Sequence, residues 1–252
     1  MIEFNLIYFL LFFTIVTLQI IVGVGVLVLG TPLLLILQHG IIDTISILLP
    51  ISILTSLINI IFFKTINKKN KIKLDKKINN FFFTLCLPAV FLGIFILKIF
   101  HELINFQILV SLIILSTLIV KIYYQNKVLN FSNLKKKIIL FFIGLIHGIT
   151  NSGGTILSLF VLSLNKNLKN QTRYSLTFFY FFLALFQYFI FIIAFPKILS
   201  FDLMIYLILI ILGGCLCGNF LVKFIKETFF RNLIELLAFL SAMFLIINNL
   251  YF

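Results

Sequence analysis

The feature that most constrains this chain is a succession of apolar runs, each about as long as a lipid bilayer is thick. Runs of about 18 or more apolar residues mark candidate membrane-spanning helices. Because lipid cannot hydrogen-bond to the backbone, a spanning chain must satisfy its N–H and C=O groups internally, as a helix does. The sequence therefore predicts an all-α polytopic membrane protein. The apolar segments are 4–38, 44–63, 78–97, 103–120, 138–164, 174–195, 203–222 and 232–250.

Charged residues are few, and most of them are lysines in the loops between the apolar segments. The chain of 252 residues is 62% hydrophobic and 11% charged, so little remains for a soluble domain. In a soluble protein the formal net charge of +13 would suggest a nucleic-acid partner. Here the lysines gather in two basic loops, 64–77 and 121–137, as is typical of the cytoplasmic side of a membrane. We therefore expect the lipid bilayer, and no nucleic acid, as a partner.

The first and fifth apolar segments are longer than one span needs, and glycines interrupt both. The interruptions are Gly23, Gly25, Gly30 and Pro32 in 4–38, and Gly144, Gly148, Gly153 and Gly154 in 138–164. A break at membrane depth is tolerated only where the backbone packs in protein or lines a cavity. Two interpretations stay open. Each break is half of a ligand site at a broken helix, or the spacing Gly144-xxx-Gly148 serves close helix packing.

The order of segments repeats, and the two halves align with an offset of 128 residues. At that offset Gly23 meets Asn151, Gly25 meets Gly153, Thr44 meets Thr172 and Gln19 meets His147, whereas Pro32 meets Phe160. Duplicated halves are common in transporters. We therefore expect two four-segment membrane repeats, residues 1–125 and 138–252, each of which starts with a glycine-broken segment.

The distribution of lysine and arginine separates two arrangements of these repeats. If every segment crosses the membrane once, the positive loops divide weakly between the two sides. If each broken segment is instead a hairpin that returns to its own side, only Lys98 and Lys197 of the 20 Lys+Arg remain on one side. The positive-inside rule favours the second arrangement. It predicts inverted repeats, with both termini outside and the two hairpins entering from opposite faces.

The glycine-rich stretches carry a resemblance to a known family. Residues 148–155 read GITNSGGT, with Phe160 after them, and residues 20–27 read IIVGVGVL, with Pro32 after them. Gly213, Gly214 and Gly218 add a further glycine cluster near the seventh segment. In these stretches and in the four-plus-four plan, the chain resembles the TauE/SafE family of sulfite exporters, also called TSUP permeases.

The resemblance implies a permease for a small sulfur-containing or related organic anion, such as sulfite, a sulfonate or sulfoacetate. It also implies a multi-pass protein of a bacterial cytoplasmic (inner) membrane. Neither stretch keeps the triple glycine of the family pattern, so the identity of the substrate does not transfer. A transporter of another solute class and a non-transporting assembly subunit are the alternatives.

An anion inside a membrane needs hydrogen-bond donors in place of water. Backbone N–H groups at the start of a half-helix supply them, the helix dipole adds partial positive charge, and glycine lets a ligand approach. The substrate-binding residues that we expect are Gly23, Gly25, Thr31, His147, Gly148, Asn151, Ser152, Gly153, Gly154, Thr155 and Arg173. The alternatives are packing glycines, hydroxyls bonded back to their own helix, a structural His147 and an Arg173 that only marks topology.

The acidic residues bear on the direction of transport. They lie near segment ends, except Glu235 in the last segment, which has Arg231 one turn before it as a partner. Without a central proton carrier, an inside-negative potential drives a monovalent anion outward by about 2.3 kcal/mol per 100 mV, so we expect export. Metal-ligand clusters, cofactor motifs and catalytic constellations are missing from the sequence. We therefore expect no metal, no cofactor and no enzyme activity.

Overall fold

The computed structural model describes residues 6–23, 25–66, 74–124, 132–164, 169–196 and 201–224, with 226, 236, 239, 240, 242–247 and 249 near the C-terminus. All regular secondary structure in these residues is helical, which confirms the all-α class. The elements are α1 (Leu6–Val22), α2 (Val26–Ile36), α3 (Ile41–Ile66), α4 (Lys76–Phe81), the π-helical turn η1 (Phe82–Cys86), α5 (Leu87–Phe100), α6 (Phe106–Tyr124), α7 (Asn133–Thr150), α8 (Gly154–Leu164), α9 (Lys169–Ala194) and α10 (Phe201–Leu221).

The helices follow the predicted apolar segments. Among the described residues, three stretches are long and apolar enough to cross a membrane: Ile41–Phe63, Lys76–Phe100 and Asn170–Ala194. The eighth predicted segment, 232–250, lies partly outside the described residues.

Two local features differ from the prediction. Gly30 and Pro32, which were expected to interrupt the first segment, both lie inside the continuous helix α2. Helix α7 begins at Asn133, within the stretch expected to be a basic loop. The Ser132 side chain caps this helix by accepting a hydrogen bond from the backbone N–H of Lys135 (3.4 Å).

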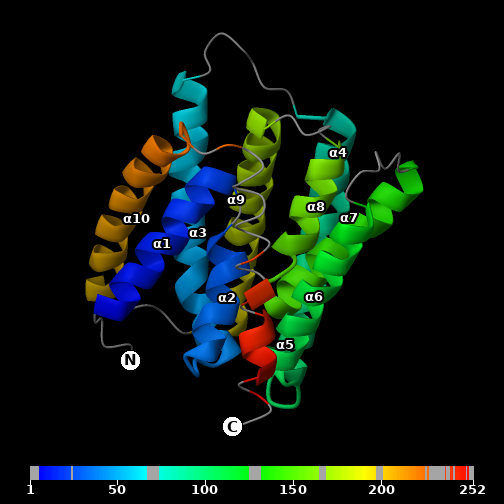
Figure 1. The fold of residues 1–252 in the computed structure, drawn as a ribbon. Helices are drawn as coiled ribbons and strands as arrows, with labels where there is room; N and C mark the ends of the chain where they lie inside the picture. The colour runs from blue at the N-terminus through cyan, green and yellow to red at the C-terminus, as the bar shows by residue number, and fades with distance from the viewer. Residues whose placement is uncertain are drawn as a thin grey trace.

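Each broken segment folds as two helices that double back. The Tyr8 hydroxyl, near the start of α1, lies 2.8 Å from His39 Nε2, just beyond the end of α2. Helix α2 therefore returns to the end of the molecule where α1 begins, as Figure 1 shows. The turn includes Gly23, whose φ of 86° lies in the left-handed region that favours glycine. In the second half, α8 likewise leads back toward the end where α7 begins.

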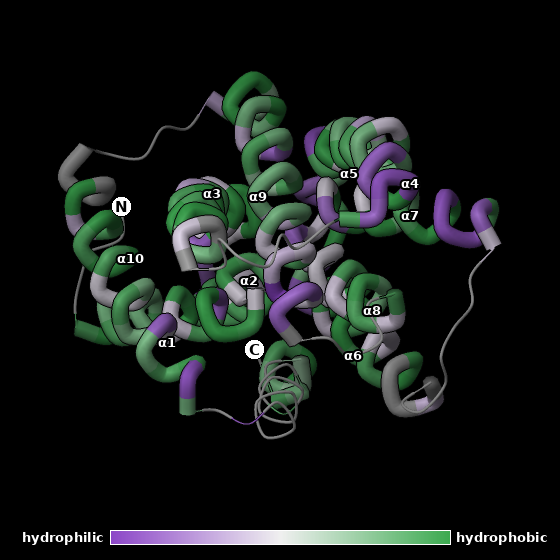
Figure 2. The backbone as a smooth tube through the Cα atoms, turned by 90° about the horizontal axis from the view of Figure 1, so that it is seen from above, coloured by the Kyte–Doolittle hydropathy of each residue, from purple (hydrophilic) through white to green (hydrophobic). Residues whose placement is uncertain are grey.

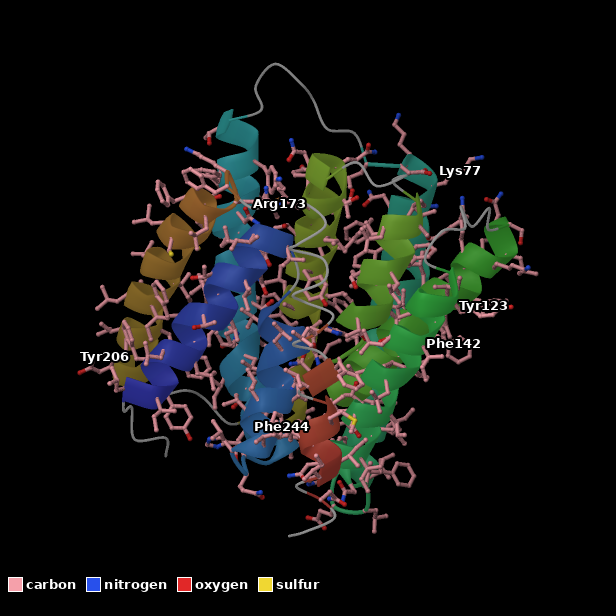
Figure 3. All side chains as sticks on the ribbon, in the orientation of Figure 1. Lys77, Tyr123, Phe142, Arg173, Tyr206 and Phe244 are labelled. Atoms are coloured by element: carbon pink, nitrogen blue, oxygen red, sulfur yellow. The ribbon has the colours of Figure 1, made fainter. Side chains whose placement is uncertain are left out.

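The helices pack in three main pairs, which Figure 2 shows from above. Helices α3 and α9 lie side by side at the centre, α1 packs along α10, and α7 packs along α5. Large apolar side chains such as Phe142 and Tyr206 point outward and are about half exposed (51% and 56%) (Figure 3). An apolar outer surface of this kind suits contact with lipid.

The contact between α5 and α7 is a backbone-to-backbone contact. A Cβ added to Gly93 would lie 2.8 Å from Gly148 Cα and would overlap Leu145 O. A Cβ added to Gly144 would likewise overlap Cys86 O. Small residues that let helix backbones approach are typical of membrane helix pairs. Gly144 and Gly148 therefore serve helix packing, which was one of the two interpretations of this spacing.

Candidate functional site

The second break, residues 151–153, turns the chain back between α7 and α8. Asn151 has a left-handed backbone (φ 61°), which Asn adopts more readily than most residues, and its N–H donates to His147 O (2.8 Å). Gly153 lies against α7, where a Cβ would be 2.5 Å from Ile143 O. Helix α8 then begins at Gly154. In its first turn the N–H groups of Thr155 and Leu157 donate to Ser152 O and Gly153 O in the break (both 3.1 Å).

Four buried polar side chains near this break leave atoms without hydrogen-bond partners. Within the part of the chain that the structure describes, these atoms are Nδ1 and Nε2 of His147, Oδ1 of Asn151, the Tyr180 hydroxyl and Oε1 of Gln187. All four residues are 0% exposed. An unpartnered buried polar group costs about 1–3 kcal/mol. Buried polar groups in folded proteins are nearly always hydrogen-bonded to protein or ordered water, so this cluster is the candidate binding site.

These four side chains are neighbours. The Gln187 Nε2 and the Asn151 backbone N–H both donate to His147 O, at 3.3 and 2.8 Å. The rings of His147 and Tyr180 meet edge to face, with centroids 6.4 Å apart. The Tyr180 hydroxyl lies against Gly154, where a Cβ would overlap it. Helix α9 therefore brings Tyr180 and Gln187 to the start of α8.

Asn151 also links the second break to the first hairpin. Its Nδ2 donates to Thr31 Oγ1 (3.1 Å), and the Thr31 hydroxyl in turn donates to Leu27 O (2.7 Å). Thr31 is 0% exposed and lies in the second turn of α2. The structure thus brings together two residues of the predicted site that are 120 positions apart in the sequence.

The first break differs from the prediction, because a side chain fills it. Gln19 folds back so that its Oε1 accepts the backbone N–H of Val26 (2.8 Å), the first residue of α2. The Gln19 amide nitrogen donates to Ser56 Oγ (3.0 Å). One of the amides that we expected to be free for a ligand near Gly25 is therefore occupied by the protein itself.

Gly23 and Arg173 also pack against each other in the first break. A Cβ on Gly23 would lie 2.8 Å from Arg173 O. The Arg173 guanidinium donates to Ile20 O near the end of α1 (2.7 Å) and lies 4.9 Å from the centre of the Phe63 ring. Arg173 is 9% exposed and lies inside the bundle (Figure 3), so it does not reach out toward a headgroup as a topology marker would. A cation at the C-terminal end of a helix is stabilised by the helix dipole.

The predicted hydroxyl groups are bonded within their own turn. Ser152 Oγ donates to Thr150 O (3.2 Å), and Thr155 Oγ1 donates to Ser152 O (2.9 Å). Their protons are therefore used locally, as the alternative interpretation of these residues has it. Gly148 faces α5 rather than the break, because it is in contact with Gly93.

Two residues of the unpartnered cluster were not predicted as binding residues. They are Tyr180 and Gln187, both on α9. Arg173, Tyr180 and Gln187 recur every seven residues along α9, which places polar groups on one face of an apolar helix. That spacing is the signal that could have found them.

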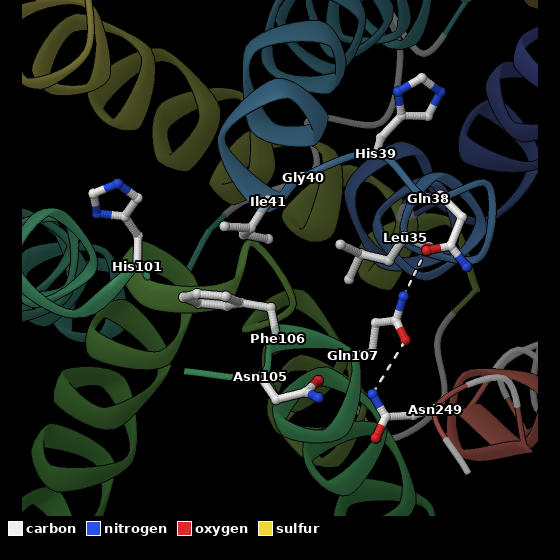
Figure 4. Close-up of a pocket in the computed structure, with 10 residues that line it drawn as sticks. All are labelled: Leu35, Gln38, His39, Gly40, Ile41, His101, Asn105, Phe106, Gln107 and Asn249. Atoms are coloured by element: carbon white, nitrogen blue, oxygen red, sulfur yellow. Dashed lines mark hydrogen bonds between the residues drawn. The ribbon is translucent and has the colours of Figure 1, made fainter. Parts of the chain in front are cut away.

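A second polar region lies at the other end of α2. A cavity of about 410 Å³ is lined there by residues that include Leu35, Gln38, His39, Gln107 and Asn249 (Figure 4). The Gln107 side chain donates to Leu35 O (3.1 Å) and accepts from Asn249 Nδ2 (3.5 Å). None of the unpartnered buried side-chain atoms in the described chain belongs to this lining. The cavity therefore lacks the unsatisfied polar groups that mark the second break.

Comparison with known proteins adds one match. The family model described as sulfite exporter TauE/SafE matches residues 8–245, which confirms the resemblance found in the glycine-rich stretches. No curated protein and no solved structure matches the chain.

Proposed function

This chain belongs to the TauE/SafE sulfite exporter family, whose members are membrane transporters of sulfur-related anions and not enzymes, and we propose that it binds its substrate at the start of α8. The candidate substrates are sulfite, sulfonates and sulfoacetate. The observation that carries the proposal is the cluster of buried, unpartnered polar atoms on His147, Asn151, Tyr180 and Gln187.

An anion at this position would meet donors without meeting bulk water. The Tyr180 O–H, an imidazole N–H of His147 and the backbone N–H of Gly154 can donate to its oxygens. The N–H groups of Thr155 and Leu157 are already bonded to Ser152 O and Gly153 O (both 3.1 Å). No Asp or Glu occurs among the buried residues in the described part of the chain, so no buried carboxylate there repels an anion. The proposed site is narrower than the sequence prediction. It keeps Thr31, His147, Asn151, Gly153 and Gly154 and adds Tyr180 and Gln187.

We also propose that the two halves are inverted copies of each other. The helix bounds support this, because adding 128 to the bounds of α2 gives those of α8, and adding 128 to those of α3 gives those of α9. The pairing of α1 with α10 has its counterpart in the pairing of α7 with α5. From their breaks, α2 and α8 run in opposite directions (Figure 1). Inverted half-helices that meet near the midplane are a common way to build a transport site.

The proposed direction is outward across a bacterial cytoplasmic membrane. Lys76 and Lys77 at the start of α4, and Lys135 near the start of α7, lie at one end of the bundle (Figures 1 and 3). The positive-inside rule assigns that end to the cytoplasm. An inside-negative potential then favours the exit of a monovalent anion by about 2.3 kcal/mol per 100 mV without a coupled proton.

Purified protein in liposomes tests this proposal. Liposomes loaded with radiolabelled sulfite or sulfoacetate should release at least one of the two faster than protein-free liposomes. An inside-negative potential should increase the rate. Release that requires an imposed proton gradient would contradict the proposed direction, and a failure to release either anion would contradict the proposed substrates.

A matched pair of variants tests the site. Asn151→Gly keeps the left-handed backbone but removes the side chain and its hydrogen bond to Thr31, which holds the turn before α8 against α2. The loss of this positioning bond, about 1.4 kcal/mol, should slow release by about tenfold. Gln38→Gly makes the same change at the other non-glycine residue with positive φ in the described chain (63°), and it should leave release unchanged. Equal release by the wild type and by Asn151→Gly would refute the proposed site.

A further inference from the structure

Two of the unpartnered atoms in the proposed site can only accept hydrogen bonds. The Gln187 amide lies 3.3 Å from His147 O, and a backbone carbonyl cannot donate, so the nitrogen of Gln187 must face it. The Asn151 amide lies against Thr31 Oγ1, whose proton is already given to Leu27 O. The nitrogen of Asn151 must therefore face Thr31. Both amide orientations are thus fixed by their partners, and both amide oxygens are left without a donor among the described residues.

The two acceptor oxygens belong to Asn151 and Gln187, which are neighbours in space. Gln187 Nε2 and the Asn151 N–H share one acceptor, His147 O. The donors of the site are next to them, since His147 carries the imidazole and its ring contacts the ring of Tyr180. The donors and the acceptors of the site therefore belong to one cluster of contacting residues.

An unsubstituted alkylsulfonate can bond only to the donors of such a site. Its oxygens accept hydrogen bonds from Tyr180 or His147, but it has no N–H or O–H for Asn151 Oδ1 or Gln187 Oε1. We infer that the site selects a small sulfonate that carries its own hydrogen-bond donor, as a hydroxyalkyl- or aminoalkylsulfonate does. This inference rests on the proposed function and narrows its substrate class.

Two probes that differ by one hydroxyl group test the inference. Isethionate (2-hydroxyethanesulfonate) and ethanesulfonate share the same skeleton, and liposomes containing the wild-type protein should transport isethionate with a kcat/KM at least about tenfold higher. Gln187→Met has a side chain of similar length without the acceptor oxygen. It should reduce the ratio toward one, because isethionate loses the acceptor for its hydroxyl and is slowed more than ethanesulfonate.

The matched control is Gln107→Met, the same change in the cavity at the far end of α2, which should leave the ratio unchanged. Because each ratio compares two solutes on one preparation, partial loss of folded protein cancels. Equal kcat/KM for the two sulfonates in the wild type would overturn the inference and leave the proposed function standing. Transport of sulfite but of neither sulfonate would also overturn it. A failure to transport sulfite, sulfoacetate and both sulfonates would instead refute the proposed function itself.

Discussion

The substitution Tyr180→Phe should stabilise the ligand-free protein and impair transport. The hydroxyl is 0% exposed and has no partner among the described residues, so its removal relieves a penalty of about 1–3 kcal/mol. The space left by one oxygen atom, roughly 15 Å³, costs about 0.4 kcal/mol at the usual dependence on cavity volume. A net gain of about 1 kcal/mol raises the unfolding midpoint of a chain of this size by about 2–4 °C.

The same substitution removes a donor to the anion. A hydrogen bond to a charged group contributes about 1.5–3 kcal/mol, so kcat/KM should fall by roughly 10- to 100-fold. The two measurements are thermal unfolding of the purified protein without sulfur anions and release from loaded liposomes. Tyr188→Phe, at a half-buried position on the same helix, is the control and should change neither value. A lower midpoint would show that the Tyr180 hydroxyl has a partner in the protein, and unchanged transport would show that it does not touch the solute; either result refutes the reasoning.

Two further predictions concern packing and orientation. Gly93→Ala places a Cβ 2.8 Å from Gly148 Cα and should destabilise the protein by about 1–3 kcal/mol, seen as a lower unfolding midpoint. Gly40→Ala should cause no loss, because its Cβ meets only Asp43 Oδ2, at 3.9 Å, and equal midpoints for the two variants would contradict the packing argument. Gly40→Cys should react with a membrane-impermeant thiol reagent added outside intact cells, whereas Lys77→Cys should react only after the membrane is opened. The reverse pattern would refute the proposed orientation.

The positions of the two breaks could be predicted from the sequence because their causes are local. Gly23 and Asn151 both adopt positive φ, and the residues suited to that conformation are few. The apolar segments were likewise predictable, since bilayer thickness alone sets their length. The ends of the helices were harder to predict, because a single capping residue, such as Ser132 before Asn133, can decide where a helix begins.

The contents of the two breaks could not be predicted, because they depend on contacts between distant segments. Gln19 and His147 occupy equivalent positions at the offset of 128, yet Gln19 reaches Val26 N while neither ring nitrogen of His147 has a partner in the described residues. The difference follows from side-chain shape, since a flexible amide can fold back to its own turn and a rigid ring cannot. The role of Gly148 depends on Gly93, which is 55 residues earlier, and no local pattern reveals that partner.

The direct contact of Gly93 with Gly148 also limits how this protein can move. No side chain separates α5 from α7 at that point. Rolling or sliding one helix over the other would therefore bring main-chain atoms into steric overlap. Any movement of α7 that uncovers His147 therefore carries α5 with it as one body, whereas a movement of the shorter helix α8 or of α9 does not. For α8 the hinge would be the left-handed turn at Asn151, and the hydrogen bond from Asn151 to Thr31 would have to break first.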